Sequence, residues 1–148
     1  MSNQNNNETP NKIEIVVMIL GLFLPLFLPA FLMLGLGKWM PDEIVYPGVM
    51  SLFLLSFGLF IVAAIFTKIL SQCGLPEKKL EELGFLGFTI SITSTFLSTY
   101  VGYFALAKIG LTSVELSPKG ILIVAIVSTI ILTILLKILE KFDTDTNE

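Results

Sequence analysis

The sequence predicts an all-α, polytopic membrane protein, a bundle of four transmembrane helices joined by short loops. Two observations lead to this prediction. Of the 148 residues, 54% are hydrophobic and only 14% are charged, whereas charged residues make up about a quarter of a typical soluble domain. The apolar residues also gather in four uncharged stretches, each about long enough to cross a hydrocarbon core of roughly 30 Å. The predicted transmembrane domain covers residues 12–141.

The first span is expected at residues 14–37, after a polar tail of residues 1–11 that we expect to be disordered. Pro25 and Pro29 lie inside this span, one helical turn apart. Each proline removes a backbone donor and crowds the preceding turn, so the helix should bend near Gly21, Pro25 and Pro29. A static kink that shapes the bundle is the simpler interpretation. A hinge, or an ion site at the freed carbonyl groups, is the alternative.

Glu14 is the acidic residue at the start of the first span and the candidate ionisable site of the membrane domain. It falls in the first turn, where a carboxylate is favoured by the helix dipole at interface depth. We therefore expect an interfacial role for Glu14. A proton-coupling carboxylate within the membrane is the alternative hypothesis.

The remaining spans follow loops that carry turn signals and charge. The second span is expected at residues 48–68, and the third at residues 83–107 after the most charged loop of the chain, in which residues 77–83 predict a short amphipathic helix. The fourth is expected at residues 120–140, after the Ser117-Pro118 break, and residues 142–148 are expected to form an acidic cytoplasmic tail.

The third span is unusual because hydroxyl groups are dense at membrane depth. Its small residues recur at spacings of three and four, which places them on one side of a helix. We call this set the small-residue face: Gly84, Gly87, Ser91, Ser94, Ser98, Gly102 and Ala105. Thr95, Thr99 and Tyr103 lie next to it and extend its polar character. Lipid cannot satisfy such groups, so this face is expected to be covered by protein.

Two interpretations of this face remain open. In the first, it is a helix–helix interface in which most hydroxyl groups bond back to a carbonyl one turn earlier. In the second, it is the polar lining of a path for a solute or an ion. The second is disfavoured because no charged residue interrupts residues 83–107.

Composition excludes several kinds of chemistry. The chain has no histidine and no arginine, and Cys73 is its single cysteine. Histidine is the commonest general base and metal ligand, and clustered thiolates are absent, so we expect no metal site and no cofactor. An enzyme relying on Asp42, Glu43 or Glu115 is disfavoured because no base stands near a nucleophile. The net charge of −3 resides mostly in ends and loops, and we expect no nucleic-acid partner.

The lysines predict the orientation. Six lie on the side of the two termini (Lys12, Lys68, Lys78, Lys79, Lys137 and Lys141) and three on the other side (Lys38, Lys108 and Lys119). The positive-inside rule therefore predicts a multi-pass protein of the plasma membrane with both termini in the cytoplasm.

These observations favour a non-enzymatic interaction, accessory or assembly subunit that self-associates in the bilayer or packs against another membrane protein. Immunity to a membrane-active toxin is one version of that function. The alternative is a small oligomeric channel or transporter with a path lined by serine and threonine.

Overall fold

The computed structural model describes residues 11–146 and is 82% helical. Four long helices, α1 (Lys12–Trp39), α2 (Val49–Gln72), α4 (Phe85–Ile109) and α5 (Pro118–Thr146), are joined by the short helix α3 (Glu77–Glu82) and by loops. Each long helix is long and apolar enough to cross a membrane. The prediction of an all-α four-helix membrane protein is confirmed. Residues 1–10 of the expected amino-terminal tail lie outside the described residues, and so do residues 147 and 148. The helix α5 continues to Thr146, through most of the expected carboxyl-terminal tail.

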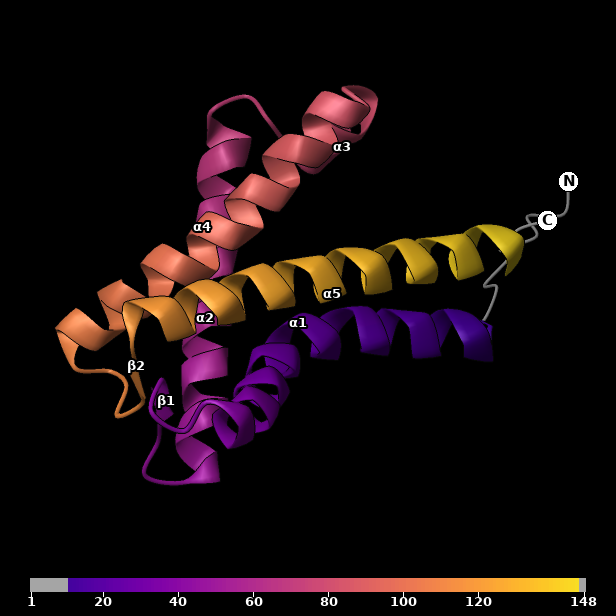
Figure 1. Cartoon of the computed structure of the whole chain (residues 1–148). Helices are drawn as coiled ribbons and strands as arrows, with labels where there is room; N and C mark the ends of the chain where they lie inside the picture. Colours follow the sequence, from indigo (N-terminus) through magenta and orange to yellow (C-terminus); the bar gives the residue numbers. More distant parts are fainter. Residues whose placement is uncertain (1–10, 147–148) are drawn as a thin grey trace, which may run out of the picture.

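The four long helices form two pairs, in which α1 lies beside α5 and α2 packs against α4 (Figure 1). The pairs converge at one end of the molecule, where two short strands lie, and diverge toward the other end, where α3, the start of α1 and the end of α5 lie (Figure 1). We call these the strand end and the α3 end. The helix α1 changes direction partway along, as expected for a helix with Pro25 and Pro29 in its interior.

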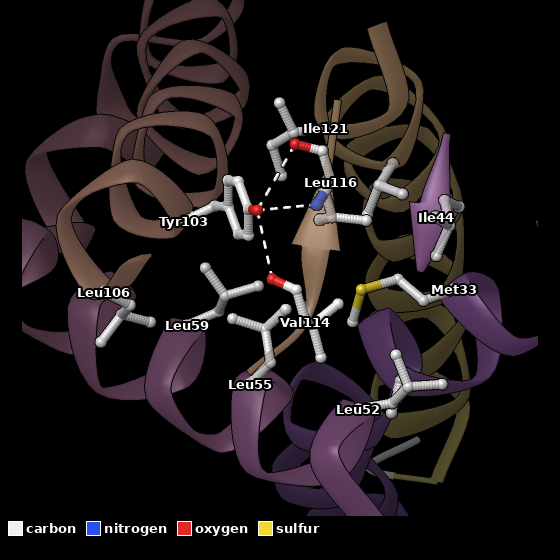
Figure 2. Close-up of a cluster of buried hydrophobic side chains, with 12 residues drawn as sticks. Met33, Ile44, Leu52, Leu55, Leu59, Tyr103, Leu106, Val114, Leu116 and Ile121 are labelled. Atoms are coloured by element: carbon white, nitrogen blue, oxygen red, sulfur yellow. Dashed lines mark hydrogen bonds between the residues drawn. The ribbon is translucent and has the colours of Figure 1, made fainter. Parts of the chain in front are cut away.

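The strand end holds the hydrophobic core. The strand β1 (Ile44–Val45) pairs antiparallel with β2 (Glu115–Leu116), with Ile44 opposite Leu116. This small sheet closes over side chains from all four long helices, and Figure 2 shows them converging on it. The buried side chains include Met33, Leu52, Leu55, Leu59, Leu106, Val114, Ile121 and Val124.

Hydrogen bonds join the two loops at the strand end. Ser117 precedes α5, with Pro118 at the first helical position, and its hydroxyl accepts the N–H of Gly120 at 2.9 Å. The backbone N–H of Ser117 donates to the carbonyl of Glu43 at 3.0 Å, and the Ser117 hydroxyl also bonds the Glu43 carboxylate. A side chain at Gly120 would place its Cβ 2.6 Å from the Glu43 carbonyl oxygen. These contacts fix the start of α5 against the loop that follows α1.

Two glycines shape the α3 end. Gly84 has a φ of +59°, in the left-handed region, and lets the chain turn from α3 into α4. Gly87 lies against the backbone of α3, because a Cβ at this position would lie 1.7 Å from the carbonyl oxygen of Leu80. The short amphipathic helix predicted before the third span is present as α3, and these glycines hold it on α4.

Candidate functional site

The small-residue face of α4 differs between its two ends. Toward the strand end its members are buried, with the exception of Ala105, and toward the α3 end several are exposed. Ser98, Thr99, Gly102 and Tyr103 are buried, as is Gly87 beneath α3, whereas Ser94 and Thr95 are half-buried and Gly84, Ser91 and Ala105 are exposed. The expected interface is therefore built within this chain along the second half of α4, while part of the first half is left uncovered.

The covered half packs on α2 through glycine. A Cβ at Gly102 would lie 3.0 Å from a methyl group of Val62, and a Cβ at Gly58 would lie 2.8 Å from a methyl group of Leu106. The two glycines therefore let α2 and α4 approach closely where they cross, as in other membrane helix pairs.

Most hydroxyl groups on α4 bond to their own helix. Thr89, Thr93, Thr95 and Thr99 each donate to the carbonyl four residues earlier at distances between 2.8 and 3.1 Å, and Ser98 donates to Thr95 at 2.9 Å. A threonine bonded in this way shows lipid or protein mainly its methyl group, and its donor is satisfied. This is the back-bonded pattern of the first interpretation.

Tyr103 closes the strand end of the bundle. Its hydroxyl accepts the backbone N–H of Leu116 at 2.7 Å and lies 3.2 Å from the carbonyl oxygen of Val114 (Figure 2). Tyr103 is 5% exposed and packs within the core. The side chain thus ties α4 to β2 and fills the space through which a path along the bundle axis would have to pass.

A small cavity lies where all four long helices meet. Its volume is about 50 Å³, and it is lined by Pro25 and Pro29 of α1 and by hydroxyl-bearing residues of α4 and α5, among them Thr95, Ser98 and Ser128. The kinked part of α1 is also held to α2, since the Ser56 hydroxyl donates to the carbonyl of Leu26. The predicted kink residues Pro25 and Pro29 therefore face the bundle interior, whereas Gly21 is half-buried and its missing side chain leaves open space.

Two grooves flank the first half of α4. The α4–α5 groove, about 260 Å³, lies between α3, α4 and the second half of α5, and its lining includes Glu77, Glu81, Phe88, Ser91, Thr95 and Lys137. The α2–α4 groove, about 290 Å³, is lined by Phe66, Leu70, Thr89, Ile90, Thr93, Ser94 and Leu97. The spacing of these residues along α4 places the grooves on opposite sides of that helix.

Glu14 lies away from both grooves. Its carboxylate accepts the backbone N–H of Asn11 at 3.3 Å, and the Asn11 side chain caps the first turn in return. Glu14 is therefore part of the cap of α1, in the first turn, where the helix dipole favours a carboxylate.

Sequence reasoning missed the groove residues on other helices. Lys137 and Glu140 fall in the last turn of the expected fourth span, residues 120–140. In the structure they lie in the α4–α5 groove with Glu77 and Glu81 of α3. The sequence did contain a signal for this contact. The end of the fourth span and the start of the third are expected on the same side of the membrane, and therefore at a similar depth. Ser128 of α5, which no sequence pattern singles out, lies at the central cavity.

Comparison with known proteins adds no family. No protein-family model, no curated protein and no solved structure matches this chain.

Proposed function

We propose that this protein is a small, non-enzymatic accessory or assembly subunit of the plasma membrane, oriented with both termini in the cytoplasm. Six of its nine lysines lie at the α3 end, which supports a cytoplasmic location for that end. In this proposal the protein associates in the bilayer with itself or with another membrane protein, and protection against a membrane-active toxin is one setting for such an association.

The α2–α4 groove is the observation that supports this proposal most strongly. Thr89 and Thr93 are exposed at membrane depth, one turn apart, and both donors are satisfied within the helix. Leu97 follows one turn later and is 41% exposed. Small, back-bonded residues beside a shallow apolar groove allow a partner helix to approach closely without leaving an unpaired polar group.

The matching wall of this groove comes from α2. Phe66 and Leu70 line it, and Ile65 and Ile69 on the same helix are about half exposed. Because α2 and α4 cross closely at Gly58 and Gly102 and diverge toward the α3 end, the groove opens toward that end. A partner helix would therefore gain contacts with both helices.

The test is a bulky substitution in the groove. We expect Thr93→Trp to abolish self-association of the full chain in lipid nanodiscs, or its co-purification with a membrane partner, while the circular dichroism spectrum stays unchanged. The matched control is Ile126→Trp, which changes an exposed residue of α5. Equal association of wild type and Thr93→Trp, or a wild type that is monomeric and retains no membrane protein, would contradict the proposal.

A channel or transporter is the second candidate, and the central cavity favours it. Thr95 lines both this cavity and the α4–α5 groove, so a polar route leads from the α3 end to the middle of the bundle. Beyond the cavity, Tyr103 and the two strands fill the strand end. Transport would require this end to open, and reconstituted protein should then move an ion or small solute in a manner that Thr95→Leu abolishes.

A further inference from the structure

The α4–α5 groove has the length of one membrane leaflet. It extends along α4 from Gly84 to Thr95, eleven residues apart, which corresponds to roughly 16 Å at about 1.5 Å per residue. Half of a hydrocarbon core of about 30 Å is about the same length. A groove of this extent begins at headgroup level and ends near the middle of the bilayer.

Polarity changes along the groove in the same direction. Charged residues line the end next to α3, namely Glu77 and Glu81 of α3 and Lys137 and Glu140 of α5. Deeper along the groove the walls carry Phe88, Ile92, Leu132 and Leu136, together with the hydroxyl groups of Ser91, Thr95 and Thr133. The Thr95 and Thr133 hydroxyl groups donate to carbonyls of their own helices. Charge is therefore confined to the end next to α3, and the deeper part of the groove is uncharged.

The position of the groove and its walls suit a lipid acyl chain. The groove has a volume of about 260 Å³. An acyl chain is already present at this depth of a membrane, and Ile92 and Leu136 offer it apolar walls to contact.

The charges select the headgroup. The Lys137 ammonium lies 4.2 Å from the centroid of the Phe88 ring, so it reaches across from α5 to the α4 wall of the groove. Lysine binds phosphate as a point charge. Three carboxylates accompany this one ammonium, so the groove as a whole disfavours an anionic lipid, and carboxylates accept hydrogen bonds from a primary ammonium.

We propose that the α4–α5 groove binds one zwitterionic phospholipid with a primary amine headgroup, of the phosphatidylethanolamine type, in the leaflet at the α3 end. Lys137 contacts its phosphate, Glu77 and Glu81 accept hydrogen bonds from its ammonium, and one acyl chain lies against Phe88, Ile92 and Leu136. The site is independent of the proposed protein interface, because that interface uses the opposite side of α4.

The test is native mass spectrometry of the full chain, released from detergent containing equal amounts of phosphatidylethanolamine, phosphatidylcholine and phosphatidylglycerol with identical acyl chains. We expect wild type to retain one phosphatidylethanolamine with a preference of roughly tenfold, the scale of one charge-assisted hydrogen bond. Lys137→Gln should lower retention of phosphatidylethanolamine. The double variant Glu77→Gln, Glu81→Gln should lose the preference for it over phosphatidylcholine.

Matched controls are Lys78→Gln and Glu82→Gln, which change exposed charges near the groove that do not line it. Both should retain lipid as wild type does, and circular dichroism should show that every variant is folded. A wild type that retains none of the three lipids, prefers phosphatidylglycerol, or has a preference that the groove variants leave unchanged would overturn the proposal.

Discussion

The two ends of this bundle use the same kind of sequence in different ways. At the strand end, Ser98, Gly102 and Tyr103 are buried against α2 and the strands. At the α3 end, Gly84 and Ser91 on the same side of α4 are exposed, and grooves open on both sides of the helix. A repeat of small residues thus marks a surface suited to close approach, and the divergence of the helix pairs decides which part of it this chain covers.

This difference assigns stability to one end and, in the function that we propose, association to the other. The strand end contains the buried core and the hydrogen bonds that join distant loops. The α3 end contains the openings and most of the lysines. Substitutions at the strand end should therefore act mainly on unfolding, and substitutions at the α3 end mainly on association and local structure.

The largest effect on stability is expected from Gly102→Leu. A Cβ at this position already lies 3.0 Å from Val62, so a leucine must force α2 and α4 apart, at a cost of about 3 kcal/mol. Thermal unfolding in detergent, followed by circular dichroism, measures the loss. The control Ala105→Leu changes an exposed residue of the same helix and should alter the free energy of unfolding by less than about 0.5 kcal/mol. Equal losses would show that the strand end is not the tightly packed one.

Tyr103→Phe is expected to destabilise the protein by about 2 kcal/mol, since the buried N–H of Leu116 loses the hydroxyl that accepts its hydrogen bond. The same unfolding measurement applies. Tyr100→Phe is the matched control, because Tyr100 is half-buried among Phe96 and Phe104 and its hydroxyl makes no hydrogen bond among the described residues. A loss no larger than that of the control would contradict the inference that the Tyr103 hydroxyl holds α4 to β2.

Thr129→Val is expected to stabilise the protein by about 1 kcal/mol, because the Thr129 hydroxyl oxygen is buried without a hydrogen-bond partner among the described residues. Valine keeps the shape and removes the unpaired group. Thr99→Val is the comparison, since Thr99 bonds the carbonyl of Thr95 and its substitution should not stabilise. A lower melting temperature for Thr129→Val would contradict this account, because it would show that the hydroxyl group is not left unpaired in the folded protein.

The smallest change in global stability, within about 1 kcal/mol, is expected for Gly87→Ala. The new Cβ must displace α3 from its contact at Leu80, while the gain in helix propensity of about 1 kcal/mol offsets part of the loss. The local effect should be clear, with faster tryptic cleavage after Lys78 and Lys79 as α3 detaches. Gly35→Ala, at a position with open space around it, should leave cleavage unchanged. Unchanged cleavage in Gly87→Ala would contradict the α3 contact.

Much of the fold was predictable from the sequence, because uncharged stretches of about twenty residues have few alternatives to membrane helices. The helix α3 was predictable from its charges after Gly74-Leu75-Pro76. The strands β1 and β2 were not, since two-residue strands lack a periodic pattern and form only because Ser117 brings the two loops together.

The site was predictable only as a face of a helix. Spacing identified Ser91 and Ser98 as neighbours on one side of α4, but their different burial depends on the angle between helix pairs, which no local pattern encodes. The roles of Gly84 and Gly87 also differ from the expected contact between transmembrane helices, because Gly84 supplies a left-handed turn and Gly87 admits the backbone of α3.

Paramagnetic broadening by dissolved oxygen tests this division most directly. Oxygen concentrates in hydrocarbon. In nanodiscs that each hold one copy of the chain, so that no partner helix covers the α2–α4 groove, it broadens the nuclear magnetic resonance signals of the amides that face lipid. We predict strong broadening at Thr89 and Thr93 and weak broadening at Ser98 and Gly102. Equal broadening at the four positions, or stronger broadening at Ser98 and Gly102, would contradict the account. It would show that the other helices do not shield the hydroxyl-bearing face of α4 from lipid at Ser98 and Gly102.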